Sequence, residues 1–279
     1  MILDEDLCEY VEPSFTKGEV GIVDFIHWAA NTEAEGVELL DFFWKSPEAE
    51  LPQVLKALEE TGLPVGAYAV GNNFAVEDEV ERARQVKIVT DGVDMAEKLG
   101  TNVVRVFSGD LSPEVTVEKA RGWIIDGLKE AVEYSEKKGV VLALENHGLL
   151  AGKSTQIKEF IEEINSPFLR STFDTGNFLL VDEDPSEAAA RLAPLVAHVH
   201  FKDFRPHQEG EGQPYVSLAG KKFTGMVAGE GEVQLTQILQ TLKKAGYSGW
   251  LSIEFEGLGD DREGTIKSIN NLKQSLQEI

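Results

Sequence analysis

The stretch VVLALENHGLLAGKSTQIKEF, from Val140 to Phe160, decides between two α/β architectures. It reads as an apolar strand, a glycine-containing turn and a helix, and its Gly-Lys-Ser is similar to the loop that binds nucleotide phosphates. That loop needs four residues between its first glycine and the Gly-Lys-Ser, so that successive backbone N–H groups surround the phosphates. Only three residues separate Gly148 from Gly152, and His147 stands where the loop needs a glycine. We therefore predict no nucleotide site here, and expect Lys153 to begin a helix or to pair with solvent anions.

Strand and helix patterns alternate along the whole chain, which predicts parallel strands joined by helices. There are eight candidate strands, and eight parallel strands close into a barrel. We predict one (β/α)8 TIM barrel domain over residues 1–279. An open, doubly wound sheet is the alternative, but no candidate strand is followed by a Gly-x-Gly-x-x-Gly turn. The candidate strands are Leu7–Val11, Val37–Phe43, Pro64–Val70, Asn102–Phe107, Val140–Glu145, Leu169–Asp174, Val196–Phe201 and Trp250–Phe255.

Glycines follow several predicted helices, because a glycine just past a helix adopts the left-handed conformation without strain. The predicted helices are Leu51–Glu60, Val80–Leu99, Val117–Lys138, Lys158–Ile164, Leu235–Lys244 and Thr265–Leu276, and the glycines are Gly62, Gly100, Gly139 and Gly246. The segment from Asp203 to Glu232 has no clear pattern and is too long for an ordinary barrel loop. We expect residues 203–232 to form a long loop over the active site. Its Lys221 and Lys222 either bind a substrate phosphate or form a solvated basic pair.

The composition argues against several classes of partner. The 279 residues include 49 acidic and 26 basic ones, a net charge of −23, which repels DNA and RNA unless a basic patch overcomes the field. Cys8 is the one cysteine, so neither an internal disulfide nor a cysteine-based zinc site can form. The first residues lack the features of a signal peptide, and no run approaches the roughly 18 apolar residues of a membrane helix. We expect a soluble, cytoplasmic protein with a small-molecule substrate and with neither nucleic-acid nor membrane partner; a homo-oligomer is compatible with the sequence.

The last four candidate strands carry ionisable residues at alternate positions, which places those residues on one face of each strand. The opposite faces are apolar and must pack under the helices. The polar faces therefore point into the barrel and present Glu145, Asp174, His200 and Glu254 at or near the carboxyl ends of successive strands. Active sites of TIM barrels lie at this end. We infer that these four side chains meet in one cavity.

Three carboxylates and an imidazole in one cavity would repel each other and stay partly protonated unless a cation lay between them. The set predicts one divalent ion, Mn²⁺ or Mg²⁺, with Co²⁺ or Zn²⁺ as alternatives. Taken singly, a Glu or Asp at a strand end is more often a helix cap or a surface charge, so the prediction depends on the four together. His198 is either a hydrogen-bonded core histidine or a substrate contact. Lys202 either neutralises charge that develops on the substrate or pairs with a carboxylate.

Five motifs carry a resemblance to a known family. They are ALENHG after the fifth strand, FDTGNF after the sixth, HVHFKD at the seventh, and GEGEV and GYSGWLSIEFEG around the eighth. In this order and spacing they resemble the xylose isomerase-like TIM barrels, in the branch of sugar and sugar-phosphate isomerases and epimerases, over nearly the whole chain. The resemblance implies that Glu145, Asp174, His200 and Glu254 bind one metal ion. It also implies that the two glutamates act as acid and base.

Two positions depart from ketose 3-epimerases of this type, which tend to carry a histidine three residues after the aspartate and an arginine six residues after the metal-binding histidine. This chain has Asn177 and Pro206 at these positions, with Arg205 next to the second. The asparagine resembles the pentulose-phosphate epimerases instead, so the identity of the sugar stays open. The expected substrate contacts are His147, Asn177, His198, Lys202 and Arg205.

The leading hypothesis is metal-assisted proton transfer on a hydroxy-ketone, by which a sugar or sugar phosphate is epimerised or isomerised through an enediolate. One of Glu145 and Glu254 would remove a carbon-bound proton and the other would return one. A metal-driven hydride shift is the competing route, and a dehydratase acting on a cyclic polyol ketone would begin with the same proton abstraction. Two further alternatives are a sugar-binding barrel without catalysis and an abasic-site endonuclease. The five histidines and the negative charge argue against the endonuclease.

Overall fold

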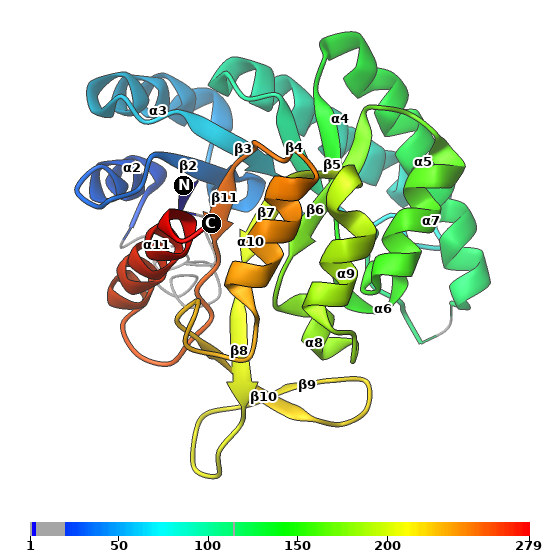
Figure 1. The fold of residues 1–279 in the computed structure, drawn as a ribbon. Coiled ribbons are helices and arrows are strands. Elements are labelled where there is room, and N and C mark those ends of the chain that lie inside the picture. Colours follow the sequence, from blue (N-terminus) through cyan, green and yellow to red (C-terminus); the bar gives the residue numbers. More distant parts are fainter. Residues whose placement is uncertain (1, 4–19, 114) are drawn as a thin grey trace.

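The computed structural model of the protein describes residues 2–3, 20–113 and 115–279. Eight parallel strands form a closed barrel in the order β1-β11-β7-β6-β5-β4-β3-β2 (Figure 1). This closed ring confirms the predicted (β/α)8 architecture. The barrel strands are β1 (Ile2–Leu3), β2 (Gly36–Leu40), β3 (Val65–Ala69), β4 (Val103–Val106), β5 (Val141–Glu145), β6 (Leu169–Asp174), β7 (Val196–Phe201) and β11 (Leu251–Ile253).

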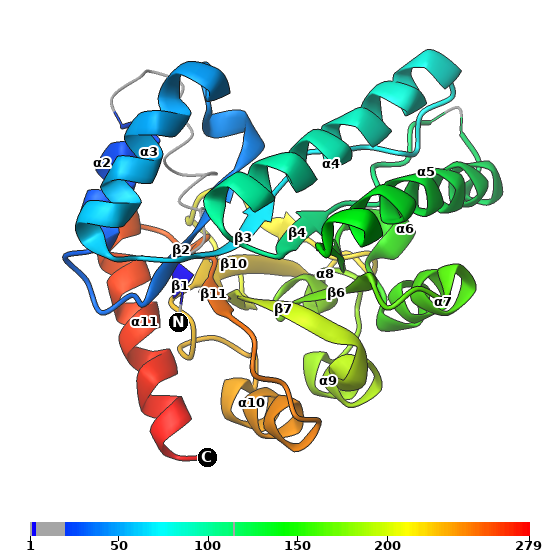
Figure 2. The same ribbon diagram turned by 90° about the horizontal axis from the view of Figure 1, so that it is seen from above.

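Helices surround the barrel (Figure 2), because each buries an apolar stripe against the outward side of the strands. In α5, for example, Ile124, Leu128 and Ala131 are fully buried and share one helix face. None of the described helices combines the length and the apolar character that crossing a lipid bilayer requires. The α-helices are α2 (Ile22–Ala29), α3 (Pro47–Thr61), α4 (Glu79–Leu99), α5 (Val117–Lys138), α6 (Gly148–Ala151), α7 (Ser154–Ile164), α8 (Asn177–Leu180), α9 (Pro185–Leu192), α10 (Leu235–Lys244) and α11 (Asp261–Gln277), and two short 3-10 helices are η1 (Asp41–Phe43) and η2 (Ala193–Leu195).

The predicted barrel strands and helices agree with the structure in kind and order, but several bounds differ and several helices were not predicted. The strand predicted at Leu7–Val11 lies outside the described residues, and β1 lies between β11 and β2 in the barrel. The second strand was predicted too long, since its last three residues form η1. Helix α9 was not predicted, although Asp184 caps its first turn and Pro185 begins it.

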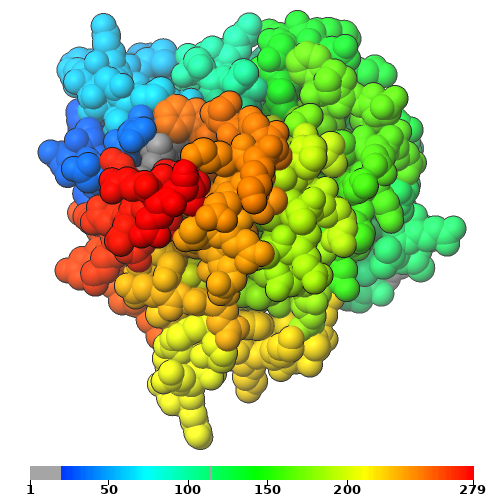
Figure 3. Space-filling view, in the orientation of Figure 1, coloured from blue at the N-terminus to red at the C-terminus, as the bar shows by residue number. Residues whose placement is uncertain are grey.

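The segment 203–232, which was predicted to be irregular, contains a three-stranded antiparallel sheet instead. This small sheet projects from the end of the barrel next to α8 and forms the protrusion of the space-filling view (Figure 3). The Asp203 carboxylate accepts hydrogen bonds from the backbone N–H groups of Gly229, Gly231 and Val233, at 2.9 to 3.0 Å, and so ties the two ends of the segment together. The strands of the small sheet are β8 (Asp203–Pro206), β9 (Tyr215–Val216) and β10 (Lys222–Met226), in the order β8-β10-β9.

Candidate active site

Strand register brings the predicted site residues together at the carboxyl end of the barrel. Asp174 lies opposite His200 where β6 pairs with β7, and His200 lies opposite Ser252 where β7 pairs with β11. Glu145 lies opposite Thr172 on the other side of β6. Because neighbouring strands are about 4.8 Å apart, inward side chains at paired positions come into contact. The alternation in the sequence therefore corresponds to one cluster in space.

The cluster centres on His200. Its Nδ1 lies 2.8 Å from Glu254 Oε1 and 3.6 Å from Glu145 Oε2. Glu145, Asp174, His200 and Glu254 are each at most 4% exposed. Burial of charged groups is costly unless they are paired or hold a cation. The four predicted ligands thus share one buried space, and their role as ligands stays a prediction.

Lys202 adds a buried ammonium to the cluster. Its Nζ lies 2.6 Å from Glu254 Oε2, 2.7 Å from Glu256 Oε1 and 3.3 Å from Asp174 Oδ2. Of the two roles considered for Lys202, pairing with carboxylates is the one that the structure contains; its contact with substrate stays a prediction. Glu256 was not among the predicted site residues, although the sequence alternation that points Glu254 into the barrel extends to Glu256.

Backbone and amide donors hold the two carboxylates that end β5 and β6. Asp174 Oδ1 accepts hydrogen bonds from the backbone N–H groups of Gly176 and Asn177, both at 2.8 Å, at the start of α8. The Asn146 side chain donates to the Asp174 carbonyl and accepts from its N–H, which joins the ends of the two strands. The Asn177 side chain donates to Glu145 Oε1 at 3.2 Å. Asn177 therefore lies at the cluster, where a substrate contact was expected.

Burial raises the pKa of Asp174 well above its usual range. The Lys202 ammonium opposes this rise, while the charges of Glu254 and Glu145 add to it. A buried carboxyl group beside two others holds its proton more tightly, because ionisation would add a third negative charge to the same space. Asp174 therefore retains its proton to a higher pH than an ordinary carboxyl group does.

Glu38, on β2, forms a second buried group behind His200 that the sequence analysis missed. Its carboxylate lies 2.6 Å from His198 Nε2 and 3.3 Å from His200 Nε2, and it accepts a hydrogen bond from the Ser252 hydroxyl at 2.7 Å. Burial alone would raise the pKa of Glu38, but His198 and His200 outweigh it and hold that pKa well below its usual range. His198 is therefore a hydrogen-bonded histidine inside the barrel, and its contact with substrate stays a prediction. The signal that could have identified Glu38 is a single charge within the apolar strand GVELL.

Arg105, on β4, is the second residue that was missed. Its Nε lies 3.2 Å from Glu145 Oε2, and its guanidinium stacks over the Phe107 ring at 4.1 Å. It also donates a hydrogen bond to the Val70 carbonyl. Arg105 is the one charged residue of the strand VVRV, so its strand offers no alternating polar face of the kind that the four later strands have. The structure shows that Glu145 has a permanent cation beside it.

The remaining predicted substrate contacts lie at the edge of this cluster or outside it. His147 is exposed just beyond β5, and its ring lies 4.9 Å from the Phe107 ring, which in turn covers Arg105. Arg205, on β8, forms an ion pair with Glu211 in the connection between β8 and β9. Both assignments stay predictions.

The donor set fits a metal ion of the predicted kind. Glu145 Oε2 and Asp174 Oδ2 are buried, and the described groups nearest to them are the ion-pair partners Arg105, at 3.2 Å, and Lys202, at 3.3 Å, neither of which lies in hydrogen-bond geometry. One ligand atom each from Glu145, His200 and Glu254 lies within 4.8 Å of the others, and the Lys202 ammonium contacts both Asp174 and Glu254. Carboxylate oxygens with one imidazole suit Mn²⁺ and Mg²⁺, and also accommodate Zn²⁺ or Co²⁺.

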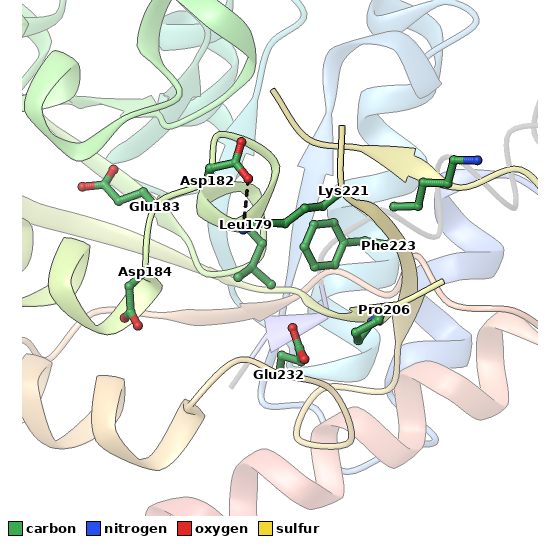
Figure 4. Close-up of a pocket in the computed structure, with 9 residues that line it drawn as sticks. Leu179, Asp182, Glu183, Asp184, Pro206, Lys221, Phe223 and Glu232 are labelled. Carbon is green, nitrogen blue, oxygen red and sulfur yellow. Dashed lines mark ion pairs between the residues drawn. The ribbon is translucent and has the colours of Figure 1, made fainter. Parts of the chain in front are cut away.

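A cavity of about 490 Å³ lies beside the small sheet, lined by side chains of α8, of the α8–α9 connection and of β10 (Figure 4). Lys221 and Lys222 line it, and Lys221 Nζ lies 3.2 Å from Asp182 Oδ1. Glu183, Asp184 and Glu232 bring further negative charge to the same walls. Four carboxylates disfavour a phosphate, so the cavity gives no support to phosphate binding by the two lysines.

The Gly-Lys-Ser segment has no room for a nucleotide phosphate. Helix α7 begins at Ser154, directly after Lys153, which is one of the two roles expected for that lysine, although the helix itself was predicted to start only at Lys158. The Glu183 carboxylate accepts hydrogen bonds from the Ser154 backbone N–H, at 2.8 Å, and from its hydroxyl, and it pairs with Arg191 at 2.7 Å. A carboxylate thus occupies the helix terminus where a phosphate would bind.

Comparisons with known proteins agree with this architecture. L-ribulose-5-phosphate 3-epimerase of Shigella flexneri is 28% identical over 262 residues, which cover 91% of this chain and 85% of that protein. Among solved structures, a D-tagatose 3-epimerase-like protein has 21% identity and a TM-score of 0.79, over 99% of this chain and 97% of that one. A xylose isomerase-like TIM barrel protein from Mycobacterium smegmatis, in complex with magnesium, has 17% identity and a TM-score of 0.71, over 91% and 87% of the two chains. Because the family model for the xylose isomerase-like TIM barrel matches residues 26–275, nearly the whole sequence, the chain belongs to that family.

Proposed function

We propose that the protein is a divalent-metal-dependent isomerase that epimerises or isomerises a sugar or sugar phosphate through an enediolate. The observation that carries this proposal is the pair of buried glutamates, Glu145 and Glu254, both within 3.6 Å of His200 Nδ1. Two carboxylates at one site can remove a proton from the carbon beside a carbonyl and return one to it. The name of the relative from Shigella flexneri, an epimerase, supports the same class of reaction.

Each of the two glutamates lies beside a different cation. Arg105 lies beside Glu145, and Lys202 lies beside Glu254. A carboxylate that has taken a proton from the substrate would keep this positive neighbour, which favours release of the proton. The arrangement therefore suits groups that accept a proton and then give one back within a single turnover.

The charge within the cluster supports a divalent ion. With both imidazoles neutral, the carboxylates exceed the cations by three charges, which a divalent ion and one proton would balance. When bound, the ion would act as a Lewis acid on two substrate oxygens and stabilise the enediolate. Mn²⁺ or Mg²⁺ fits these ligands first, with Co²⁺ or Zn²⁺ as alternatives. Five carboxyl groups (Glu38, Glu145, Asp174, Glu254 and Glu256) and two cations (Arg105 and Lys202) are buried in the cluster.

A ketopentose phosphate is the substrate class that we favour. Asn177 occupies the position at which the sequence departs from ketose 3-epimerases toward pentulose-phosphate epimerases, and its amide contacts Glu145. The relative named L-ribulose-5-phosphate 3-epimerase supports the same choice. L-ribulose 5-phosphate is therefore the first substrate to test, with unphosphorylated ketoses beside it.

Turnover in heavy water tests the two-glutamate proton transfer. The manganese-loaded protein should introduce deuterium at the carbon beside the carbonyl, because a carboxylate exchanges its proton with solvent. Glu145→Gln and Glu254→Gln should each lower turnover by on the order of a hundredfold or more while metal still binds detectably. Glu183→Gln is a matched control, since Glu183 is an ion-paired carboxylate next to α7 and outside the cluster.

Three results would count against the proposal. Product without solvent deuterium at low conversion would indicate a hydride shift. A product that lacks one molecule of water relative to the substrate would identify a dehydratase. Tight sugar binding in the presence of a chelator, without turnover, would favour the non-catalytic alternative.

A further inference from the structure

Glu38 lies behind the proposed metal ligand His200 and takes no part in the proton transfer proposed above. Its Oε1 lies 3.3 Å from His200 Nε2. Its Oε2 lies 2.6 Å from His198 Nε2 and 2.7 Å from the Ser252 hydroxyl. All four side chains are fully buried, so water cannot replace any of these contacts. The hydrogen-bonding groups of these four side chains must therefore pair with one another.

Hydrogen-bond chemistry fixes the direction of each contact. An ionised carboxylate only accepts hydrogen bonds, so each of the three groups that face Glu38 donates. His200 therefore carries a hydrogen on Nε2, and Nδ1 is the nitrogen that offers a lone pair once any hydrogen that it shares with Glu254 has left. This Nδ1 is the atom that lies 2.8 Å from Glu254 and 3.6 Å from Glu145. The nitrogen that faces the cluster is the one that can bind a metal ion.

We propose that Glu38 is a positioning residue that fixes His200 in the Nε2–H tautomer and directs its Nδ1 lone pair at the metal site. This inference rests on the metal binding of the proposed function. His198 and Ser252 support Glu38 by donating to Oε2, which leaves Oε1 for His200. The His198 ring also packs edge-on against the His200 ring, with centroids 5.0 Å apart, and limits its rotation.

A direct ligand role for Glu38 is the main rival. One ligand atom each from Glu38, His198 and His200 lies within 4.8 Å of the others. A metal ion there would require both histidines to lose the Nε2 hydrogens that Glu38 now accepts. The three donors already satisfy the carboxylate, so the positioning role accounts for the contacts without a second ion.

Nitrogen-15 spectra of the histidine side chains in the metal-free protein test the tautomer directly. Wild-type His200 should carry a hydrogen on Nε2, whether or not a second hydrogen lies between Nδ1 and Glu254. In Glu38→Gln the new amide can donate to Nε2, so the Nδ1–H form should gain population. Glu38→Asp, which keeps an acceptor on a shorter side chain, should restore the wild-type tautomer in part.

Cobalt binding tests the consequence for the metal site. In Glu38→Gln, the affinity for Co²⁺ measured by calorimetry should fall about 10–100-fold, and the visible spectrum of bound Co²⁺ should change. Ser252→Ala removes one donor but keeps the carboxylate, so its loss should be much smaller. Glu183→Gln, which alters a carboxylate outside the cluster, should change unfolding temperature without changing Co²⁺ affinity.

An unchanged His200 tautomer together with wild-type Co²⁺ affinity in Glu38→Gln would overturn the inference. Binding of two Co²⁺ ions by the wild type, with one lost in Glu38→Gln, would also overturn it and identify Glu38 as a ligand. If the wild type bound no Co²⁺, the proposed metal function would fail. The spectra of the metal-free protein would then still report whether Glu38 controls the tautomer.

Discussion

Replacing Lys202 by methionine should make the stability of the protein depend on a divalent metal ion. Methionine keeps much of the apolar volume of the lysine but removes the ammonium that lies 2.6 Å from Glu254, 2.7 Å from Glu256 and 3.3 Å from Asp174. Breaking a buried ion pair by removing one partner costs about 3–5 kcal/mol. Since about 1 kcal/mol shifts the unfolding temperature of a chain of this size by roughly 2 °C, we expect a fall of roughly 6–10 °C in the presence of a chelator.

A divalent ion should return part of this loss, because it brings positive charge to Asp174 and Glu254 in place of the ammonium. Ligand binding to the folded state alone stabilises it by about 2.7 kcal/mol at a concentration of about 100 times Kd. The ion should also bind more tightly to the variant, in which no ammonium competes for the same oxygens. The rise in unfolding temperature on adding Mn²⁺ should therefore be larger in Lys202→Met than in the wild type.

Calorimetric unfolding with chelator and with saturating Mn²⁺ measures both effects. Lys221→Met is the matched control: the Lys221 side chain is 64% exposed and pairs with Asp182 at 3.2 Å, so its loss should cost at most about 1 kcal/mol, with or without metal. Equal destabilisation of Lys202→Met with chelator and with Mn²⁺ would refute the reasoning. An unchanged unfolding temperature would refute it as well.

Three further predictions follow from the site and its surroundings. The affinity for Mn²⁺ should weaken as the pH falls, and should begin to do so at a higher pH than an ordinary carboxyl group would cause, because burial raises the pKa of Asp174 and the ion must displace the proton that Asp174 retains; calorimetry at several pH values that showed constant affinity would contradict this. The Gly-Lys-Ser segment should bind no ATP, since Glu183 occupies the terminus of α7; micromolar ATP binding that disappears in Lys153→Ala would show the opposite. Replacing Lys221 and Lys222 together by alanine should leave turnover of phosphorylated substrates close to that of the wild type, because Lys221 pairs with Asp182 in an acidic cavity; a large loss restricted to phosphorylated substrates would assign the pair to phosphate binding.

The four predicted ligands could be located from the sequence because alternation along a strand is a local property. Each late strand has one apolar face that must pack under a helix, so the direction of Glu145, Asp174, His200 and Glu254 follows from their nearest neighbours. Closure into a barrel then brings the polar faces together whatever the loop lengths. The pairing of β6 with β7, which places Asp174 opposite His200, is the one further fact that assembles the cluster.

Glu38 and Arg105 could not be assigned in the same way. Glu38 is the one charge in an otherwise apolar strand, so its strand offers no second polar residue against which to test alternation. Its partner His198 lies 160 residues away in the sequence. Only the burial rule, that a charge inside an apolar strand needs a partner, would have drawn attention to it. The partner itself follows from tertiary structure alone.

The small sheet could not be predicted from the sequence for a different reason. Its strand β9 has two residues, too few for any periodicity to be read. The Asp203 carboxylate that binds three backbone N–H groups around Gly229 and Gly231 replaces regular secondary structure there. A side chain that satisfies backbone donors leaves no repeating pattern in the sequence.

The charge argument for a metal ion survives because the groups that it left out, which are Glu38, Glu256, Arg105 and Lys202, cancel in charge. The four predicted ligands carry three carboxylates, and the folded cluster adds two carboxylates and two cations, so three negative charges remain uncompensated in both counts. The positions of the added groups nevertheless matter. Lys202 contacts Asp174 and Glu254, the oxygen donors that a metal ion would need, and Glu256 gives the ammonium a place to remain when the ion binds. The affinity of the site for a divalent ion should therefore depend on competition with a resident ammonium, and not only on the number of carboxylates around it.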